Sequence, residues 1–241
     1  MDKNFNWNLF LQPYELAING FIIKLESMKK QYVFKGEKNP IESISGRIKS
    51  PTSILEKAKR LNVRFKDIPK YIQDIGGIRI TCKYINDVYE VKSILDSRKD
   101  IEIVHVKDYI KKPKSSGYRS LHIIAKYFVE TISGQNPIFI EFQIRTLTMH
   151  LWASIEHSLK YKYFENIPEE IRKKLYDAAK ITEELDVKMG AIQEEVEALG
   201  NGKIRKDFDN EWEENIIKRG NLWYMQFTVN INAKKNLIIN F

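Results

Sequence analysis

Four stretches of this chain carry charged and polar side chains at spacings that suit the binding of a charged nucleotide. The most concentrated stretch, KPKSSGYRSLH from Lys112 to His122, holds three cations, a glycine, a tyrosine and a histidine within eleven residues. Lys and Arg side chains neutralise phosphates, and an exposed ring such as Tyr118 can stack on a base. The stretch predicts a site for a polyanion with an aromatic ring. The alternative is a basic loop that only meets solvent.

A second group of phosphate-binding candidates surrounds the start of a helix, for which Ser50 and Pro51 are the expected N-cap and first-turn residues. Positions i, i+4 and i+7 of a helix share one face, and a helix N-terminus itself attracts anions. Four cations and a hydroxyl therefore converge on one volume. They are Arg47, Lys49, Ser53, Lys57 and Arg60. A basic helix face that is merely solvated remains the alternative.

Two carboxylates lie at expected strands, where they could hold a hard cation such as Mg²⁺. Asp74 precedes two glycines and a strand on which Arg79 alternates with apolar residues. Glu141, Gln143 and Arg145 alternate with apolar residues in the same way. Such a polar ladder is costly on a sheet face unless it lines a wet or ligand-filled cleft. For Asp74, the capping of a turn is an equally good explanation.

The four histidines do not suggest a zinc site. His150 and His157 lie seven residues apart, about 10 Å along a helix, and no pair of cysteines accompanies them. We therefore predict a structural role for both. The single Cys82 excludes an internal disulfide and is expected to be a buried, inert thiol.

Hydrophobic periodicity predicts the elements that must position these residues. A helix begins at Pro13, carries one apolar stripe from Tyr14 to Tyr32 and ends in the KGEKNP stretch. Helices and strands then alternate, which indicates an α/β (α+β) fold with a mixed sheet. The expected helices are 51–61, 87–97 and 147–163, and the expected strands are 77–83, 101–106, 120–129 and 137–145.

The cleanest periodicity follows Pro168, where nine seam positions alternate strictly by four and three residues. These are Ile171, Leu175, Ala178, Thr182, Leu185, Met189, Ile192, Val196 and Leu199. So narrow a stripe is typical of helix–helix assembly, so we expect a homo-oligomer; the alternative is packing on the same domain. The chain is thus divided into an N-terminal helical segment (1–40), a core domain (41–165), an oligomerisation helix (166–200) and a tail (201–241), whose alternating apolar residues would suit a β-hairpin.

Composition and charge narrow the class of protein and its possible partners. The chain has 241 residues, 43% hydrophobic and 30% charged, which fits one globular core rather than a disordered chain. A net charge of +8 predicts anionic partners, and nucleotides, nucleic acid and anionic membranes all qualify. We expect no secretory signal and no membrane span, because neither a basic start with an apolar run nor about 18 consecutive apolar residues occurs. The cytoplasm is the expected location.

The motifs, in their order and spacing, resemble the synthetase domain of RelA/SpoT-type enzymes. They are GRIKSPTSILEKAKR, DIGGIRI, KPKSSGYRSLH and EFQIRT with MHLWASIEHSLKYK, and the resemblance runs from about Pro13 to Leu199. No His-Asp dipeptide occurs and we expect no hydrolase or regulatory domains, so the chain resembles the stand-alone small alarmone synthetases. This resemblance implies a nucleotidyltransferase-like fold, a tetramer and Mg²⁺ as cofactor. It also implies transfer of the ATP pyrophosphoryl group to the ribose 3′-hydroxyl of GDP or GTP, which makes the alarmone (p)ppGpp of the bacterial stringent response.

The resemblance further implies roles for individual residues. Asp74 and Glu141 would bind Mg²⁺, and Glu141 would also activate the 3′-hydroxyl. The residues that would hold ATP are Arg47 and Arg79 at the adenine, with Lys49, Ser53, Lys57 and Arg60 at the phosphates. The residues that would hold GDP or GTP are Tyr118, stacked on guanine, with Lys114, His122, Gln143 and Ala153.

One departure and two alternatives accompany this prediction. Ser43 and Ser45 stand where the family's allosteric alarmone site has an aromatic residue and a Thr, which argues against allosteric activation. A nucleotide-adding transferase usually needs a D-x-D pair, yet the pair Asp207 and Asp209 lies in the polar tail. A basic RNA-binding module without catalysis is the other alternative, so RNA is a further candidate partner. The choice among GDP, GTP and GMP as acceptor stays open.

Overall fold

The computed structural model describes residues 5–132, 134–162 and 168–200. The chain divides into two compact units, residues 1–190 and 191–241, and the described part of the second unit is the end of one helix. The helices are α1 (Trp7–Lys35), α2 (Pro51–Arg60), α3 (Ile68–Tyr71), α4 (Ile85–Asp96), α5 (Leu147–Lys162) and α6 (Glu169–Gly200), with a short 3-10 helix, η1, at Phe65–Asp67. The strands are β1 (Ser43–Ile48), β2 (Gly76–Cys82), β3 (Ile101–Asp108), β4 (Leu121–Thr131) and β5 (Gly134–Thr146).

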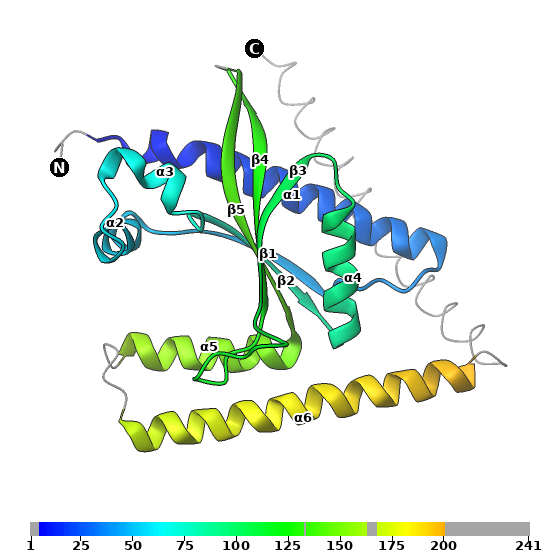
Figure 1. The fold of residues 1–241 in the computed structure, drawn as a ribbon. Coiled ribbons are helices and arrows are strands. Elements are labelled where there is room, and N and C mark those ends of the chain that lie inside the picture. The colour runs from blue at the N-terminus through cyan, green and yellow to red at the C-terminus, as the bar shows by residue number, and fades with distance from the viewer. Residues whose placement is uncertain (1–4, 133, 163–167, 201–241) are drawn as a thin grey trace, which may run out of the picture. The chain divides into compact units, whose positions relative to one another are not determined.

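The strands form one sheet in the order β1-β2-β5-β4-β3 (Figure 1). β2 and β5 run parallel at its centre, whereas β1 pairs with β2, β4 with β5 and β3 with β4 in antiparallel fashion. A parallel pair needs a long crossover connection, which α4, β3 and β4 supply here. The predicted mixed sheet flanked by helices is therefore confirmed.

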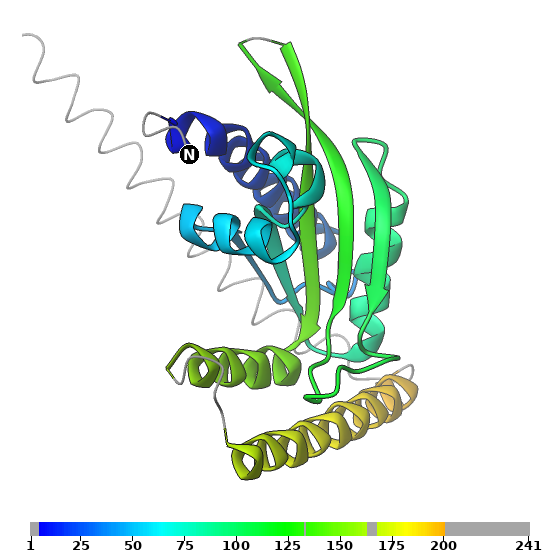
Figure 2. The same ribbon diagram turned by 60° about the vertical axis from the view of Figure 1, so that its left-hand side comes forward.

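One face of the sheet is apolar and packs against α1 and α4 (Figure 2). Phe142 of β5 is fully buried and meets Phe21 of α1 edge-on, with 5.0 Å between the ring centroids. β1 lies so close to α1 that a Cβ on Gly46 would come within 2.2 Å of Ile18 Cγ2. Each large apolar side chain buried there stabilises the fold by ~1.5–3 kcal/mol. This face holds the sheet together and leaves the opposite face to polar residues.

Helix α1 begins earlier than the sequence predicted. The side chain of Asn6 accepts a hydrogen bond from the Leu9 backbone N–H at 3.1 Å and caps a helix that starts at Trp7. The expected start at Pro13 is wrong, because Pro13 lies inside the helix, where it removes one backbone donor. The end is as predicted, at Gly36 in the left-handed conformation with φ of 62°.

Strand β1 has no counterpart among the predicted strands. Its sequence, SISGRI, contains two serines and a glycine and is largely exposed, so neither alternation nor β-propensity marks it. Pairing with β2 places Arg47 opposite Gly77 and Ser45 opposite Arg79. The strand therefore carries one predicted site residue onto the polar face of the sheet.

The first part of α6 packs against α5 and against the segment that leads into β4. Tyr118, Trp152, Ala153 and Ala179 form a second, smaller hydrophobic cluster. Trp152 of α5 donates its indole N–H to the Leu175 carbonyl of α6 at 2.9 Å. The first part of α6 thus lies beside α5 (Figure 1).

Two further contacts hold the segment before β4 on α6. Gly117 has φ of 85°, and a Cβ there would lie 2.5 Å from Ala179 Cβ, so this position requires glycine. Arg119 pairs with Asp186 at 3.3 Å, with the two side chains 5% and 2% exposed. Asp186 also accepts a hydrogen bond from the Thr146 hydroxyl at 3.1 Å. Helix α6 therefore fixes the backbone on either side of Tyr118.

The nine seam positions of α6 differ in how far their side chains are buried. Leu175, Ala178 and Thr182 are half-buried, whereas the last five positions are 42% to 77% exposed. Because an ideal helix has 3.6 residues per turn, a strict 3.5-residue seam drifts by about 20° per heptad. The buried stripe accordingly shifts to Asp186, and the seam turns outward. Oligomerisation through that outward part stays a prediction.

In the described ranges no helix is both long enough and apolar enough to cross a membrane. Cys82 is fully buried, and burial raises the pKa of its thiol, as an inert cysteine requires. The predicted hairpin in the tail, together with Asp207 and Asp209, lies outside the described residues.

Candidate active site

The polar face of the sheet borders a cleft of about 1020 Å³. Seven Lys or Arg side chains and three carboxylates line it, and this positive excess attracts a polyanion. Eleven of the thirteen predicted site residues are among its lining: Arg47, Lys57, Arg60, Asp74, Arg79, Lys114, Tyr118, His122, Glu141, Gln143 and Ala153. Lys49 and Ser53 are not. Lys49 contacts Asp74 instead, and the Ser53 hydroxyl accepts a hydrogen bond from Ser50 at 3.0 Å.

Strand register gathers these residues although they are far apart in the sequence. Gly77 of β2 pairs with Glu141 of β5, and two residues further Arg79 pairs with Gln143. His122 of β4 is the partner of Gln143 on its other side. Because side chains alternate along a strand, these positions share the face opposite the apolar core. The predicted polar ladder thus lines a cleft.

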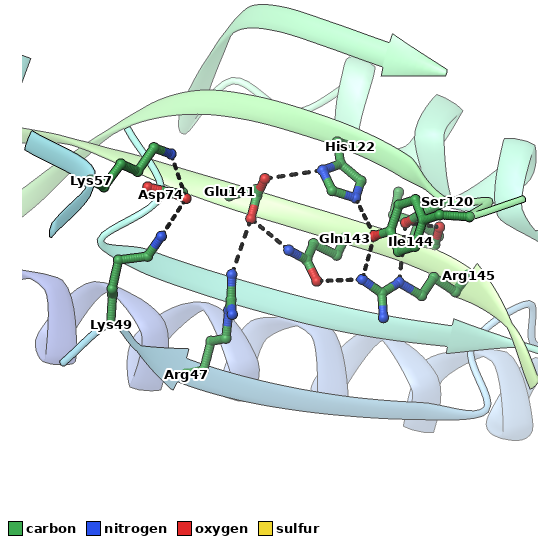
Figure 3. Close-up of polar contacts among 11 residues, drawn as sticks. Arg47, Lys49, Lys57, Asp74, Ser120, His122, Glu141, Gln143, Ile144 and Arg145 are labelled. Carbon is green, nitrogen blue, oxygen red and sulfur yellow. Dashed lines mark hydrogen bonds and ion pairs between the residues drawn. The ribbon is translucent and has the colours of Figure 1, made fainter. Parts of the chain in front are cut away.

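Arg47 of β1 crosses over Gly77 to reach Glu141. A Cβ at position 77 would lie 3.3 Å from Arg47 Nε, a crowded contact that glycine avoids. Arg47 Nη2 lies 3.5 Å from Glu141 Oε2 (Figure 3). Glycine at position 77 therefore lets an arginine of the same chain approach the backbone closely.

Asp74 lies against two lysines (Figure 3). Its Oδ2 is 2.6 Å from Lys49 Nζ and 2.7 Å from Lys57 Nζ. Burial acts to raise the pKa of Asp74, but the hydrogen bonds and charges of both ammonium groups outweigh burial and lower that pKa. Its Oδ1 is buried and has no hydrogen-bond partner among the described residues. One oxygen of an ionised carboxylate is thus left for a further ligand.

Glu141 is a buried carboxylate, 8% exposed, that is held on both oxygens. His122 Nδ1 lies 3.0 Å from Oε1, and Gln143 Nε2 donates to Oε2 at 2.6 Å. Burial and the charge of Asp74 act to raise the pKa of Glu141, while His122 and Gln143 lower it, and the net effect is a lowered pKa. Glu141 is therefore ionised at neutral pH and fixed in orientation.

Tyr118 is not the exposed ring that the sequence predicted. It is 8% exposed, because Trp152 and α6 pack against it. Its Oη accepts a hydrogen bond from Arg145 Nη2 at 2.6 Å and lies 2.8 Å from His122 Nε2. Lys114 Nζ lies 4.6 Å from the ring centroid. Burial raises the pKa of Tyr118, with a partial offset from the Arg145 charge.

Cations crowd one another on this face of the sheet. Burial lowers the pKa of Arg79, and the charges of Arg145 and Arg47 lower it further. The pKa of His150, in the first turn of α5, is lowered by burial and by the charges of Arg79 and Arg145. The Nε of Arg79 is buried without a hydrogen-bond partner in the described part of the chain. A bound anion would relieve this repulsion.

Sequence reasoning missed one wall of the cleft. His105, Lys107 and Tyr109 line it from the end of β3, as does His157 of α5, for which a structural role was expected. The period of two over residues 105–109 could have revealed the first three, but the predicted strand ended at Val106. Strand alternation correctly predicted that Arg145 lies on the polar face of the sheet, but the sequence assigned it no role.

Comparison with known proteins agrees with this arrangement. Residues 46–166 match the region found in RelA / SpoT proteins. The chain is 42% identical over 205 residues to the GTP pyrophosphokinase YjbM of Bacillus subtilis (strain 168), a match that covers 85% of this chain and 97% of that protein.

Solved structures are similar over the same range. Small alarmone synthetase 1 from Bacillus subtilis, bound to its product pppGpp, has a TM-score of 0.76 at 43% identity, covering 79% of this chain and 97% of its own. A GTP pyrophosphokinase family protein from Streptococcus pneumoniae has a TM-score of 0.77 at 42% identity, covering 80% and 95%. The fold that the motifs predicted is confirmed by both.

Proposed function

This chain belongs to the RelA/SpoT family, and we propose that it is a small alarmone synthetase that transfers the pyrophosphoryl group of ATP to the ribose 3′-hydroxyl of GDP or GTP. The observation that carries the proposal is the buried carboxylate of Glu141, held on both oxygens in a cleft lined by seven cations. The similarity to a GTP pyrophosphokinase and to a synthetase bound to pppGpp supports it.

In the proposed reaction Glu141 takes the proton of the 3′-hydroxyl while that oxygen attacks the β-phosphorus of ATP and AMP leaves. Because its pKa is lowered, Glu141 is ionised and ready to accept a proton, but it is a weak base. The hydroxyl must therefore be aligned and the phosphate charge neutralised before transfer. Phosphoryl transfer of this kind depends on positioning and electrostatics more than on covalent help.

On the donor side, the adenine would lie between Arg47 and Arg79, and the phosphates would meet Lys57 and Arg60. All four line the cleft. Lys49 would act through Asp74, whose Oδ2 it contacts at 2.6 Å. Ser53, in the first turn of α2, would contribute its hydroxyl at that helix's N-terminus.

On the acceptor side, guanine would stack on Tyr118, with Lys114, His122, Gln143 and Ala153 around it. The hydrogen bonds of the Tyr118 hydroxyl fix the ring before a base arrives. Stacking of this kind contributes ~1–3 kcal/mol per base. The Lys114 ammonium, now 4.6 Å from the ring centroid, is close enough to meet an acceptor phosphate.

Asp74 and Glu141 would hold Mg²⁺. Within the described ranges no group of three or more His, Cys, Asp or Glu side chains could hold a metal ion. Mg²⁺, however, usually takes one or two carboxylates and completes its shell with water and substrate phosphates. The unpaired, buried Oδ1 of Asp74 fits such a ligand. When bound, the metal would neutralise charge on the transferring phosphates.

We further propose that the enzyme is a cytoplasmic homo-oligomer, a tetramer by resemblance, assembled through the outward part of the α6 seam. Leu185 and Ile192 are 45% and 52% exposed there. Replacing both with Glu should give monomers in sedimentation with a folded core. A wild-type chain that sediments as a monomer at micromolar concentration would contradict this assembly. RNA remains a further candidate partner because of the net charge of +8.

One incubation separates the candidate functions. The protein is mixed with ATP, Mg²⁺ and GDP, GTP or GMP in turn, and the guanosine products are resolved by ion-exchange chromatography. A synthetase converts at least one acceptor to a product with two more phosphates and releases AMP. Pyrophosphate release would instead indicate a nucleotide-adding transferase, and no turnover together with tight RNA binding would indicate the binding module.

A further inference from the structure

Arg145 is a buried cation whose hydrogen-bond partners in the described part of the chain are neutral side chains. Its side chain on β5 is 5% exposed, and its Nε donates to Ser120 Oγ at 3.2 Å. Its Nη2 donates to Tyr118 Oη at 2.6 Å and to Gln143 Oε1 at 2.8 Å. A buried charge is costly unless it is hydrogen-bonded, so these acceptors hold the guanidinium in one place. A lysine ammonium cannot reproduce these hydrogen bonds, because they are donated from several nitrogens of one rigid, planar guanidinium.

One branch from Arg145 runs through Gln143 to Glu141 (Figure 3). A guanidinium only donates hydrogen bonds, so the side-chain oxygen of Gln143 must face Arg145. The amide nitrogen then faces the carboxylate and donates to Glu141 Oε2 at 2.6 Å. Arg145, which only donates, and Glu141, which only accepts, therefore hold the Gln143 amide in one orientation.

A second branch runs through Tyr118 and His122. Tyr118 Oη accepts from Arg145 Nη2 and lies 2.8 Å from His122 Nε2. The ionised Glu141 only accepts hydrogen bonds, so the neutral His122 ring carries its proton on Nδ1, and Nε2 accepts from the Tyr118 hydroxyl. Nδ1 lies 3.0 Å from Glu141 Oε1 and donates to it. The two branches thus start at one guanidinium nitrogen and end on the two oxygens of one carboxylate.

We infer that Arg145 is the positioning residue for the Glu141 carboxylate, because it holds the Gln143 amide directly and the His122 ring through Tyr118, and these two groups together fix both carboxylate oxygens. The inference deepens the proposed function, on which it rests for its kinetic consequence. Arg145 acts through Tyr118, His122 and Gln143 rather than on the reacting atoms. Replacing Arg145 should leave the Glu141 carboxylate in the site but free to rotate.

The His122 tautomer can be measured without substrate and so does not depend on the proposed function. Selective ¹⁵N labelling reports the four histidines of the chain, and a His122→Gln variant assigns the signal. In the neutral imidazole, His122 should carry its proton on Nδ1 and not on Nε2. In Arg145→Lys this preference should weaken. A wild-type His122 that carries a proton on Nε2 overturns the inference.

Kinetics test the consequence. Loss of a residue that orients a carboxylate ligand typically costs about 10- to 100-fold, so Arg145→Lys should lower kcat by that factor, with the ATP KM within about threefold. Tyr118→Phe keeps the ring and breaks one branch, and should lower kcat about 10-fold. Since that branch starts at Arg145, the double variant Arg145→Lys with Tyr118→Phe should have a kcat no more than about twofold below that of Arg145→Lys alone.

Arg98→Lys is the matched control, because Arg98 is a partly buried arginine that pairs with Asp100 away from the cleft. It should keep wild-type kcat and report the effect of a buried Arg-to-Lys change on folding. The inference is overturned by a kcat of Arg145→Lys within threefold of wild type, by a loss confined to KM, or by multiplicative losses in the double variant. If Arg145→Lys does not fold, Tyr118→Phe decides alone, and an unchanged kcat then refutes the second branch.

Discussion

The buried ion pair between Arg119 and Asp186 should make α6 indispensable to the stability of the catalytic unit. The two side chains are 5% and 2% exposed, and Arg119 Nη1 lies 3.3 Å from Asp186 Oδ2, while Arg119 Nε is buried without a hydrogen-bond partner among the described residues. Replacing Asp186 with Leu leaves the buried guanidinium of Arg119 without its counter-charge. Breaking such a pair from one side costs about 3–5 kcal/mol, a large share of the 5–15 kcal/mol that is typical of a folded domain.

A double-mutant cycle separates the cost of an unpaired charge from the contribution of the pair. Arg119→Met combined with Asp186→Leu removes both charges and fills similar volume, so it should be near neutral relative to wild type. The coupling between the two sites should therefore be several kcal/mol, well beyond the few tenths expected of independent positions. Thr146 loses its hydrogen bond to Asp186 in Asp186→Leu and in the double variant, so that loss cancels from the coupling energy, although not from the comparison of either variant with wild type.

Urea unfolding followed by tryptophan fluorescence is a suitable assay, because Trp152 packs on α6 and bonds to Leu175. Protein concentration must be fixed, since assembly would add to apparent stability. The reasoning is refuted if Asp186→Leu costs less than about 1 kcal/mol, or if the double variant is as unstable as the single one.

Three further outcomes are expected. Glu141→Gln should lower pyrophosphoryl transfer more than 100-fold while the Kd for ATP stays within about threefold; transfer within about tenfold of wild type would mean that the base lies elsewhere. Gly117→Ala should lower the unfolding free energy by about 2–3 kcal/mol more than Gly134→Ala. Both glycines have positive φ, but only at Gly117 does an added Cβ meet Ala179. Equal losses of unfolding free energy in the two variants would exclude that clash. Asp100 has a pKa lowered to about 2, since Arg98 and Lys24 outweigh its burial, so Asp100→Asn should cost about 1 kcal/mol after solvent screening of a side chain 32% exposed. That difference is present above pH 4 and should vanish as the pH falls toward 2 in urea titrations; a constant difference would be contrary to this assignment.

The apolar face of the sheet was predictable because it obeys a local rule. Ile78 and Ile80, like Ile140 and Phe142, alternate with polar residues, and period-two alternation in sequence becomes one face of a strand. The same rule placed Glu141 and Gln143 on the other face. These two residues line the cleft together with nine others of the thirteen predicted site residues.

Three failures have a different origin, since each depends on a partner distant in sequence. Tyr118 is buried because α6, more than fifty residues later, packs on the segment before β4. β1 is a strand because β2 pairs with it, not because SISGRI favours one. The role of Arg145 depends on the rotamers of three neighbours, which no spacing reveals. The drift of the α6 seam is geometric and could have been calculated from its 3.5-residue period.

The central claim is that an intact pyrophosphoryl group passes from ATP to the acceptor. ATP labelled in either the α- or the β-phosphate is incubated with Mg²⁺ and GDP, with 3′-deoxy-GDP as the control acceptor. The β label should appear in the guanosine product and the α label in AMP, and 3′-deoxy-GDP should give no product. An α label in the guanosine product, release of ADP, or an active 3′-deoxy acceptor would contradict pyrophosphoryl transfer to the 3′-hydroxyl.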